Sequence, residues 1–512
     1  MRSLARVAYA VGAPVLAYYA WTTTRLWRGT ARTVEALGAA ARAPRSEREP
    51  WRCRFVVLLP MLREDRVVER ACRHYAAAAR AGVPLEVIIA TSAAERDERT
   101  AAGDALRAMA GGGDKTGWRE LAAKAVRPEG IEPLSAALAA RDAGGADATL
   151  ESLARPTTAE AAEPLVRRLN EELGSAVFHH VSAGPEIASK VAKLNFAFSR
   201  WRAADGTGST YVAVYDADSL PDAGTFAAVE RVVADRVADD SRPPEILQQV
   251  SCYCANLTEL GPLAIADALA QTRWALGFEY PLYERYARRL RAGRLRPLVY
   301  CVGHGCFVSA RFLRRIGGFP TVSHTDDLAL GYLASALGAE VAPLPALDYC
   351  EASPKPLQSI AQAGFWFSGS ARFHKDLRAF GTLLPARPPR AQWCLLHLDG
   401  HGRNAAWAGR PAAWLLATGL AAASRASPLV RALVLAHLAY VQAGFLQTVR
   451  TLRIVPGAAE RTGLDEVGPA RLASAFTAAS ATFVLRSAGP MHAAVTALGR
   501  RRDRRTTWKL ER

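Results

Sequence analysis

The sequence predicts an α/β fold, and three short apolar runs carry that prediction. The runs FVVLL (residues 55–59), LEVIIA (85–90) and YVAVY (211–215) are rich in β-branched and aromatic residues, as buried strands are. A helical stretch, residues 69–81, separates the first two. Strands that alternate with helices form βαβ units, so we expect a Rossmann-like, mainly parallel sheet.

Composition restricts the class of protein. With 50% hydrophobic and 22% charged residues among 512, the chain resembles folded domains and not a disordered tail. Its 65 Lys and Arg against 48 Asp and Glu give a net charge of +17, which indicates a polyanionic partner. The arginines cluster beside apolar segments and form no basic stripe interleaved with aromatic residues. We therefore expect a membrane partner and no nucleic acid.

The eight cysteines are scattered along the chain, and only Cys252 and Cys254 are close to each other. This spacing argues against a disulfide scaffold and against a structural zinc site. We expect reduced thiols.

The N-terminus predicts a membrane anchor within residues 1–28. Residues 7–24 carry no charge, and their number is the lower limit for a spanning helix. Tyr18, Tyr19 and Trp21 stand where a signal peptide would have a small-residue cleavage site, so we expect an uncleaved anchor. Arginines follow up to Arg48, and the positive-inside rule then places the middle of the chain in the cytoplasm.

Residues 405–500 predict further membrane or interfacial helices. Arginines separate several uncharged segments, namely 411–424, 432–449, 472–485 and 487–499. Two crossings, four crossings, and Ala-rich helices packed on a soluble core all fit this pattern. The basic tail, residues 501–512, would touch anionic lipid. We expect a multi-pass protein of the inner (plasma) membrane.

Residues 50–385 hold the predicted catalytic domain. Its stretch from about 95 to 175 is rich in Ala, Gly, Arg and Glu and shows no chemistry, so we expect a helical surface insertion there. Ligands of parallel sheets bind beyond the carboxyl ends of the strands. Functional residues should therefore follow the apolar runs directly.

Asp216 and Asp218 do follow the YVAVY run directly. Two carboxylates at positions i and i+2 can converge on a hard divalent cation that leaves open positions for phosphate oxygens. Acidic pairs are also common in turns, which is the alternative for an isolated D-x-D motif. The place after a buried strand favours the metal site.

A second acidic motif, Thr325-Asp326-Asp327, precedes the helix-like run LALGYL at residues 328–333. Thr325 would cap this helix, and the two Asp residues would suit its positive end. A carboxylate in that place can also take a proton from an attacking hydroxyl. The structural and the catalytic roles are compatible.

Three more segments carry candidate ligands. Lys190 could meet a phosphate, although a helical Lys is commonly solvated. The glycines around His304 permit close approach to a ligand, and His304 would contact a diphosphate or an acceptor, or serve the structure alone. Trp366 offers a flat apolar face for stacking on a sugar, although core packing is the commoner role.

These motifs have a recognisable order, and residues 54–370 resemble glycosyltransferase family 2, especially its membrane-embedded, synthase-like members. VVLLPMLRE at residues 56–64 is similar to the family's strand and P-x-x-N-E motif. The segments 190–195 and 216–219 are similar to K-x-x-x-L-N and D-A-D-S. Residues 303–319, 325–327 and 362–366 take the places of G-x-G with G-G-F, T-E-D and Q-x-x-R-W.

The resemblance implies a GT-A fold and inverting transfer from a nucleotide-sugar donor, a UDP- or GDP-sugar. It implies Asp218 as the ligand of Mg²⁺ or Mn²⁺ and Asp327 as the general base. The residues implied at the donor are Pro60, Glu64, Lys190, Asn195 and Asp216. Those implied at the acceptor and the diphosphate are Gly303, His304, Asp326, Gln362 and Trp366.

The chain departs from the family pattern in three places. Arg63 replaces the Asn of P-x-x-N-E, and Phe365 replaces the Arg of Q-x-x-R-W. The second apolar run is followed by Thr91 and Ser92 instead of acidic residues, for which Glu95 or Asp97 would have to substitute. Phe365 favours a single addition to a lipid-linked or cell-envelope glycan over processive synthesis. The alternative is a catalytically silent membrane scaffold that keeps the fold.

Overall fold

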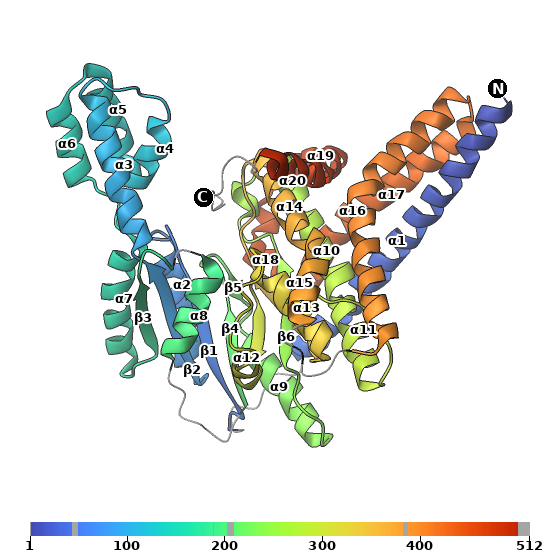
Figure 1. Ribbon diagram of the computed structural model, residues 1–512, viewed down its shortest axis with the longest axis horizontal. Helices are drawn as coiled ribbons and strands as arrows, with labels where there is room; N and C mark the ends of the chain where they lie inside the picture. Colours follow the sequence, from blue (N-terminus) through green and yellow to red (C-terminus); the bar gives the residue numbers. More distant parts are fainter. Residues whose placement is uncertain are drawn as a thin grey trace. The chain divides into compact units, whose positions relative to one another are not determined.

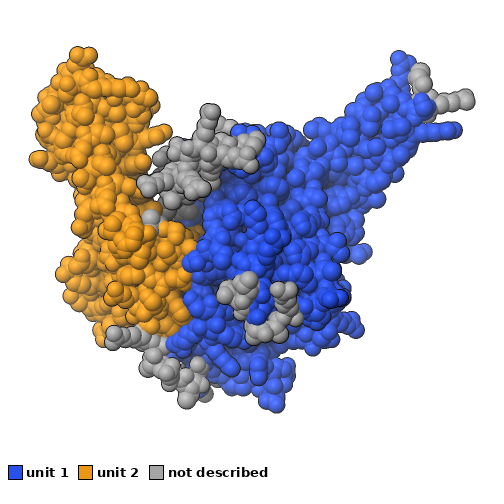
Figure 2. Space-filling model, in the orientation of Figure 1, with its two compact units in different colours: residues 1–54, 208–214, 218–512 blue, residues 55–207, 215–217 orange. Residues whose placement is uncertain are grey.

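The computed structural model describes residues 2–42, 50–187, 189–201, 209–381, 384 and 388–499. The chain forms two compact units, coloured separately in Figure 2. Unit 1 comprises Met1–Arg54, Gly208–Val214 and Asp218–Arg512, and unit 2 comprises Phe55–Thr207 and Tyr215–Ala217. Both units combine helices and strands, so the predicted α/β class is confirmed. Arg48 and the basic tail lie outside the described residues.

Unit 2 contains three parallel strands in the order β3-β2-β1. They are β1 (Cys53–Pro60), β2 (Leu85–Ser92) and β3 (Phe178–Ala183). The side chains of β1 and β2 are almost all buried, as expected for strands covered on both faces. The predictions of strands at 55–59 and 85–90 are therefore confirmed.

The helices that accompany these strands are α2 (Val68–Arg80), α7 (Thr158–Leu173) and α8 (Lys190–Arg200). Helix α2 packs on α7, α7 packs on β3, and α8 packs on β2. Helix α7 begins with a capping box, in which Thr157 and Glu160 satisfy each other's backbone N–H groups.

A second group of helices in unit 2 has a small core of its own, and Figure 1 shows it standing apart from the three strands. Its elements are α3 (Ala94–Ala110), α4 (Trp118–Ala125), the 3₁₀ turn η1 (Pro128–Gly130), α5 (Ile131–Ala140) and α6 (Ala143–Ser152). Leu106, Leu134 and Leu150 are buried among them. Helix α7 does not belong to this group, because it packs on β3.

Unit 1 orders its strands β4-β7-β6-β8-β5. They are β4 (Ser209–Val214), β5 (Leu220–Pro221), β6 (Ile246–Cys252), β7 (Cys306–Ser309) and β8 (Val341–Tyr349). Strands β6 and β8 pair in parallel, whereas β4–β7, β6–β7 and β5–β8 are antiparallel. The strand predicted at 211–215 is confirmed as β4. The expectation of a mainly parallel sheet is wrong for this unit, because the short strands β5 and β7 run in the opposite direction.

The helices of unit 1 surround these strands. Before β8 come α9 (Thr225–Ala238), the 3₁₀ turn η2 (Leu257–Glu259), α10 (Pro262–Trp274), the π-helical turn η3 (Ala275–Glu279), α11 (Tyr280–Arg291), α12 (Ala310–Ile316) and α13 (Asp326–Leu337). After β8 come α14 (Pro356–Ala371), α15 (Phe373–Gly381), α16 (Arg390–Ala423), α17 (Ser427–Ile454), α18 (Ala458–Thr462), the 3₁₀ turn η4 (Leu464–Glu466), α19 (Pro469–Ser487) and α20 (Gly489–Gly499).

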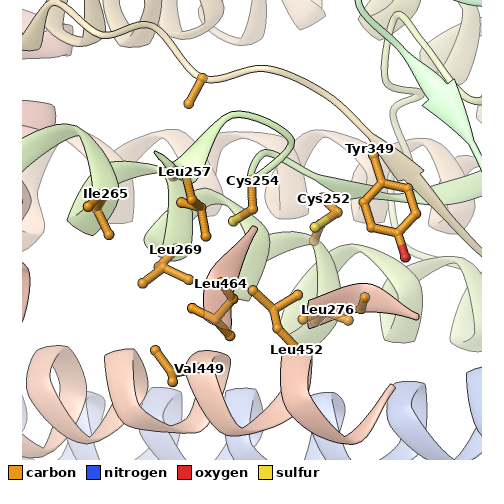
Figure 3. Packing of buried hydrophobic residues seen from close by; sticks show 14 of the residues in the cluster. Cys252, Cys254, Leu257, Ile265, Leu269, Leu276, Tyr349, Val449, Leu452 and Leu464 are labelled. Carbon is orange, nitrogen blue, oxygen red and sulfur yellow. The ribbon is translucent and has the colours of Figure 1, made fainter. Parts of the chain in front are cut away.

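A large core joins the strands of unit 1 to its C-terminal helices (Figure 3). Cys252 of β6 and Tyr349 of β8 lie in one apolar cluster with Leu269 of α10, Leu452 of α17 and Leu464 of η4. All eight cysteines of the chain are free, and Cys394 is the exposed one. The chain therefore has no disulfide scaffold, as its cysteine spacing predicted.

Helix α1 (Arg2–Arg42) packs side by side with α16 and α17 (Figure 1). Small and branched apolar residues fill the space between them, including Ala8, Ala417 and Leu433. Large apolar side chains also point outward from the same helices, among them Val7, Trp21, Leu415, Leu416 and Leu435.

Among the described residues, one helix, α17, has the length and apolar composition needed to cross a membrane. The uncharged segment 7–24 lies within α1, and residues 411–423 of the next segment lie within α16, but neither helix meets that test. Their Trp, Thr, Gly and Pro residues and the arginines beside them lower the mean hydropathy. The multi-pass membrane location expected from the sequence is therefore not supported.

Candidate functional site

In unit 2, Lys190 and Asp216 form an ion pair. Lys190 is the first residue of α8, and its Nζ lies 2.6 Å from Asp216 Oδ1. The two side chains remain 31% and 36% exposed. Lys193, on the same helix, donates a hydrogen bond to the Met61 carbonyl at 2.9 Å and so ties α8 to the end of β1. Lys190 is thus a paired but accessible cation and not a freely solvated one.

The other residues expected at the donor lie on the same elements. Pro60 ends β1 and is buried, and Asn195 is half-buried on α8. The Glu64 backbone N–H donates to Thr158 Oγ1 at 2.8 Å. Glu95, considered above as a substitute ligand, instead accepts hydrogen bonds from the Thr158 N–H at 2.9 Å and hydroxyl at 3.1 Å. The Glu95 carboxylate therefore stabilises the start of α7. That Pro60, Glu64 and Asn195 bind the nucleotide-sugar stays a prediction.

Asp218 follows β4 and belongs to unit 1. Its side chain is 2% exposed, and its Oδ2 accepts a hydrogen bond from the Glu351 N–H at 3.3 Å. The next residue, Ser219, places its Oγ 3.5 Å from Cys350 Sγ. Asp218 is therefore held against the end of β8. Burying a charged carboxylate costs free energy unless an opposite charge compensates it, so the burial of Asp218 is consistent with a role as a cation ligand.

His304, Asp348 and Cys350 form a buried cluster that could hold a metal ion. His304 Nδ1 lies 2.7 Å from Asp348 Oδ2 and 3.2 Å from Cys350 Sγ, and all three ligand atoms lie within 4.8 Å of one another. Among the described residues, Asp348 Oδ1 is buried without a hydrogen-bond partner. A cation or a water molecule would satisfy that oxygen. The cysteine spacing gave no signal of this cluster, because Cys350 at the end of β8 meets His304 from a distant loop before β7 rather than a second cysteine.

The donor atoms of this cluster differ from those that Mg²⁺ or Mn²⁺ prefers. An imidazole nitrogen and a thiol sulfur suit zinc-like ions, whereas Mg²⁺ and Mn²⁺ favour oxygen ligands. The 2.7 Å separation of His304 and Asp348 is also the length of a strong hydrogen bond, which orients the imidazole. Asp218 therefore stays the predicted ligand of Mg²⁺ or Mn²⁺. The contact of its neighbour Ser219 with Cys350 links it to this cluster.

The backbone beside His304 requires glycine. Gly305 has a φ of 63°, and a Cβ there would lie 3.0 Å from Gln249 Cβ and 3.2 Å from Asp348 Oδ2. Gln248 donates a hydrogen bond to the His304 carbonyl at 2.9 Å. The tight turn that begins at the half-buried Gly303 therefore brings the imidazole onto Asp348.

Asp326 and Asp327 open helix α13. Thr325 occupies the N-cap position but makes no side-chain cap bond, so the predicted cap is wrong. Its hydroxyl lies 3.2 Å from Ser323 Oγ. Asp327 Oδ1 accepts a hydrogen bond from the Leu328 N–H at 2.8 Å, and the two carboxylates lie at the positive end of the helix. Asp327 is partly exposed, as a proton acceptor must be.

Trp366 lies near His304 through one intervening ring. Its ring centroid is 6.5 Å from that of Tyr253, which is 5.7 Å from that of His304. The Arg486 guanidinium lies 5.6 Å from the Trp366 ring centroid. Gln362 lies one turn earlier on α14 and is half-buried. Trp366 therefore belongs to a polar, aromatic surrounding and not to the apolar core.

Glu279 was not predicted from the sequence. The Tyr300 hydroxyl donates a hydrogen bond to Glu279 Oε1 at 2.9 Å. Burial raises the pKa of Glu279 to about 7; the Tyr300 hydrogen bond and the charge of His304 lower it, and the charge of Asp327 raises it. Glu279 thus shares its surroundings with two predicted site residues. Its π-helical turn has no sequence periodicity that would have revealed it.

No protein-family model and no curated protein matches the chain. Among solved structures, it is similar to the mannosyltransferase PcManGT from Pyrobaculum calidifontis in complex with GDP-Man and Mn²⁺, at 16% identity, a TM-score of 0.43, and coverage of 90% of this chain and 99% of that one. It is also similar to S. aureus TarS 1–349, at 9% identity, a TM-score of 0.30, and coverage of 86% and 92%.

Proposed function

We propose that this chain is an inverting, metal-dependent glycosyltransferase that moves a sugar from a UDP- or GDP-sugar to an acceptor hydroxyl. A connected set of polar groups in unit 1 carries the proposal. From Asp218, short contacts lead through the end of β8 to His304, and His304 and Asp327 both act on the pKa of Glu279. These contacts support a single site in which Asp218 would bind the cation and Asp327 would accept the proton.

Asp327 would be the general base. The acceptor oxygen attacks the anomeric carbon from the face opposite the nucleoside diphosphate, and its proton passes to the Asp327 carboxylate. The bond from the anomeric carbon to the diphosphate breaks, its electron pair leaves with the diphosphate, and the configuration inverts. Mg²⁺ or Mn²⁺, when bound to Asp218, would neutralise the charge of that leaving group.

The remaining predicted residues complete this scheme. In unit 2, Lys190 would leave Asp216 to meet a phosphate of the donor, and Pro60, Glu64 and Asn195 would contact the nucleotide. In unit 1, Gly303 and His304 would approach the diphosphate. Asp326, Gln362 and Trp366 would contact the acceptor.

Helix α17 would attach the protein to a membrane, with α1 and α16 packed against it. The outward apolar residues of all three helices support this attachment. The acceptor would accordingly be a lipid-linked or cell-envelope glycan. Catalysis at the cytoplasmic face follows from the arginines after residue 24 and stays a prediction.

The test is sugar transfer by the purified protein into a membrane lipid extract, with Mg²⁺ or Mn²⁺ and a panel of labelled UDP- and GDP-sugars. We expect one donor to label the lipid fraction, and label to be lost with Asp327→Asn. Asp239→Asn, a change at an exposed carboxylate after α9, is the matched control and should keep transfer. Absence of both transfer and donor hydrolysis with every donor would instead identify a silent scaffold.

A further inference from the structure

A π-helical turn interrupts the helix that runs from α10 through η3 to α11. Such turns are rare and are frequent at functional sites. Helix α1 braces this one: the Thr33 hydroxyl donates a hydrogen bond to the Leu276 carbonyl at 2.7 Å. A Cβ on Gly29 would lie 2.1 Å from the Gly277 carbonyl oxygen, so the two backbones touch. The turn is therefore a fixed feature, and Glu279 is its last residue.

The carboxyl group of Glu279 is held at one oxygen. Tyr300 donates to Oε1 at 2.9 Å, and Trp274 Nε1 donates to the Tyr300 hydroxyl at 3.2 Å. Trp274 in turn stacks on Phe278 with the ring centroids 4.2 Å apart. Among the described residues, Glu279 forms no ion pair, and its Oε2 has no hydrogen-bond partner. The side chain is partly exposed, so this oxygen is open to a ligand.

The partner of Glu279 lies on the segment that positions the predicted base. Tyr300 is followed by Cys301, whose N–H donates to the Asp327 carbonyl at 3.3 Å. A Cβ on Gly331 of α13 would lie 2.3 Å from Tyr300 Cα, so α13 packs directly on this segment. The same segment continues to His304. Glu279, Asp327 and His304 are therefore positioned by one short piece of backbone.

We propose, on the basis of the glycosyltransferase function above, that Glu279 is an acceptor-binding residue that hydrogen-bonds the hydroxyl groups of a neutral sugar beside Asp327. Its free oxygen and the Tyr300 hydroxyl together offer both acceptor and donor atoms. The aromatic rings of Tyr253, which lies against His304, and of Trp366, which lies against Tyr253, provide flat faces for the C–H groups of a pyranose.

The same arrangement selects against an acceptor that reacts through a phosphate. Two carboxyl groups, those of Glu279 and Asp327, would repel a phosphate at the reacting end. Burial raises the pKa of Glu279 to about 7, so near neutral pH this carboxyl group can donate or accept, as sugar hydroxyls require. The acceptor class is therefore a neutral glycan and not a polyprenyl phosphate.

The test compares octyl α-mannoside and octyl β-glucoside with a long-chain polyprenyl phosphate as acceptors, using the full-length protein in detergent and the donor found above. We expect transfer to an octyl glycoside. Glu279→Gln should raise the acceptor KM about tenfold, because a neutral amide group replaces a carboxylate oxygen that would accept from the sugar hydroxyl. The donor KM and the slow hydrolysis of the donor without acceptor should stay unchanged. Glu284→Gln, on the same helix, is the matched control.

Tyr300→Phe keeps the ring packing and removes the hydroxyl, so it tests the proposal even if Glu279→Gln fails to fold. We expect a smaller rise of the acceptor KM with this variant. Transfer to the polyprenyl phosphate alone, or an acceptor KM within twofold of wild type in both folded variants, overturns the inference and leaves the glycosyltransferase function standing. Absence of both hydrolysis and transfer in the wild type overturns the two together.

Discussion

Lys190–Asp216 in unit 2 and His304–Asp348 in unit 1 are pairs of nearly equal length in very different surroundings. The closest atoms are 2.6 Å and 2.7 Å apart. The side chains of the first pair are 31% and 36% exposed, whereas those of the second are 10% and 0% exposed. An exposed pair can exchange its partner for a ligand at little cost, whereas a buried pair fixes the fold around it. The comparison distinguishes side chains that can change their partner from side chains that hold the fold in one arrangement.

The largest effect should come from Asp327, a partly exposed carboxylate in the same unit as the buried pair. Asp327→Asn should lower transfer by about 10²- to 10⁴-fold, because the proton acceptor is lost, while stability stays unchanged. Donor turnover and the urea midpoint, measured on the same sample, check this. Near-normal transfer by a folded Asp327→Asn protein would show that the base is another group.

Asp348→Ala should have the next largest effect, on the fold instead of the chemistry. Removing one member of a buried pair leaves the other without its partner and should lower the free energy of unfolding by about 3–5 kcal/mol. Urea unfolding gives this value. Glu172→Ala, in the exposed pair with Arg80, is the control and should cost under about 1 kcal/mol. Equal losses in the two variants would remove the distinction between buried and exposed pairs.

Glu279 sharpens the comparison, because it is a mostly buried carboxyl group without a cationic partner among the described residues. Its pKa, raised by burial to about 7, lies above the value of 4.5 expected in the unfolded chain. The unfolded state therefore releases this proton first as the pH rises, and stability should fall between pH 4.5 and 7 by on the order of 3 kcal/mol. The urea midpoint at pH 5 and pH 8 measures the fall.

Glu279→Gln should remove most of that decline. A smaller decline should persist, because burial also raises the pKa of Asp376, to about 6. A decline of the same size in Glu279→Gln and wild type would contradict the assignment of the raised pKa to Glu279.

The smallest effect on the fold should come from Lys190→Ala. Loss of an exposed ion pair should change the free energy of unfolding by less than about 1 kcal/mol. The donor KM should nevertheless rise roughly tenfold, because the lysine would otherwise meet a phosphate of the donor. Donor titrations and urea unfolding of the same variant separate the two quantities. A stability loss as large as that of Asp348→Ala would show that this pair is structural.

The strands could be predicted where their own residues form a continuous apolar run. The apolar runs that form β1, β2 and β4 are evident, because buried strands require continuous apolar residues. The mixed direction of the unit 1 strands was not, because β5 has two residues and β7 has four, too few to show a pattern. The absence of charge also suggested more membrane helices than mean hydropathy supports, since an uncharged segment with Trp, Thr, Gly and Pro residues is not necessarily apolar enough to cross.

The candidate site was predictable where a residue follows a strand or opens a helix. Asp216, Asp218 and Asp327 follow that rule. Asp348 does not, because it lies inside the apolar strand β8, where a carboxylate is stable only with a partner from a distant segment. Glu279 does not either, because a π-helical turn is set by tertiary contacts with α1 and not by the sequence around it.

Because α1 contacts the π-helical turn, the smallest fragment that keeps the candidate site intact must include this helix. A shortened chain that begins after Arg42 would keep every motif quoted above. It would nevertheless expose the Leu276 carbonyl that Thr33 now covers and open the backbone contact between Gly29 and Gly277. Glu279 would then sit on an unsupported loop. Helix α1 thus supports the turn that carries Glu279, and removing this helix to improve solubility would remove that support.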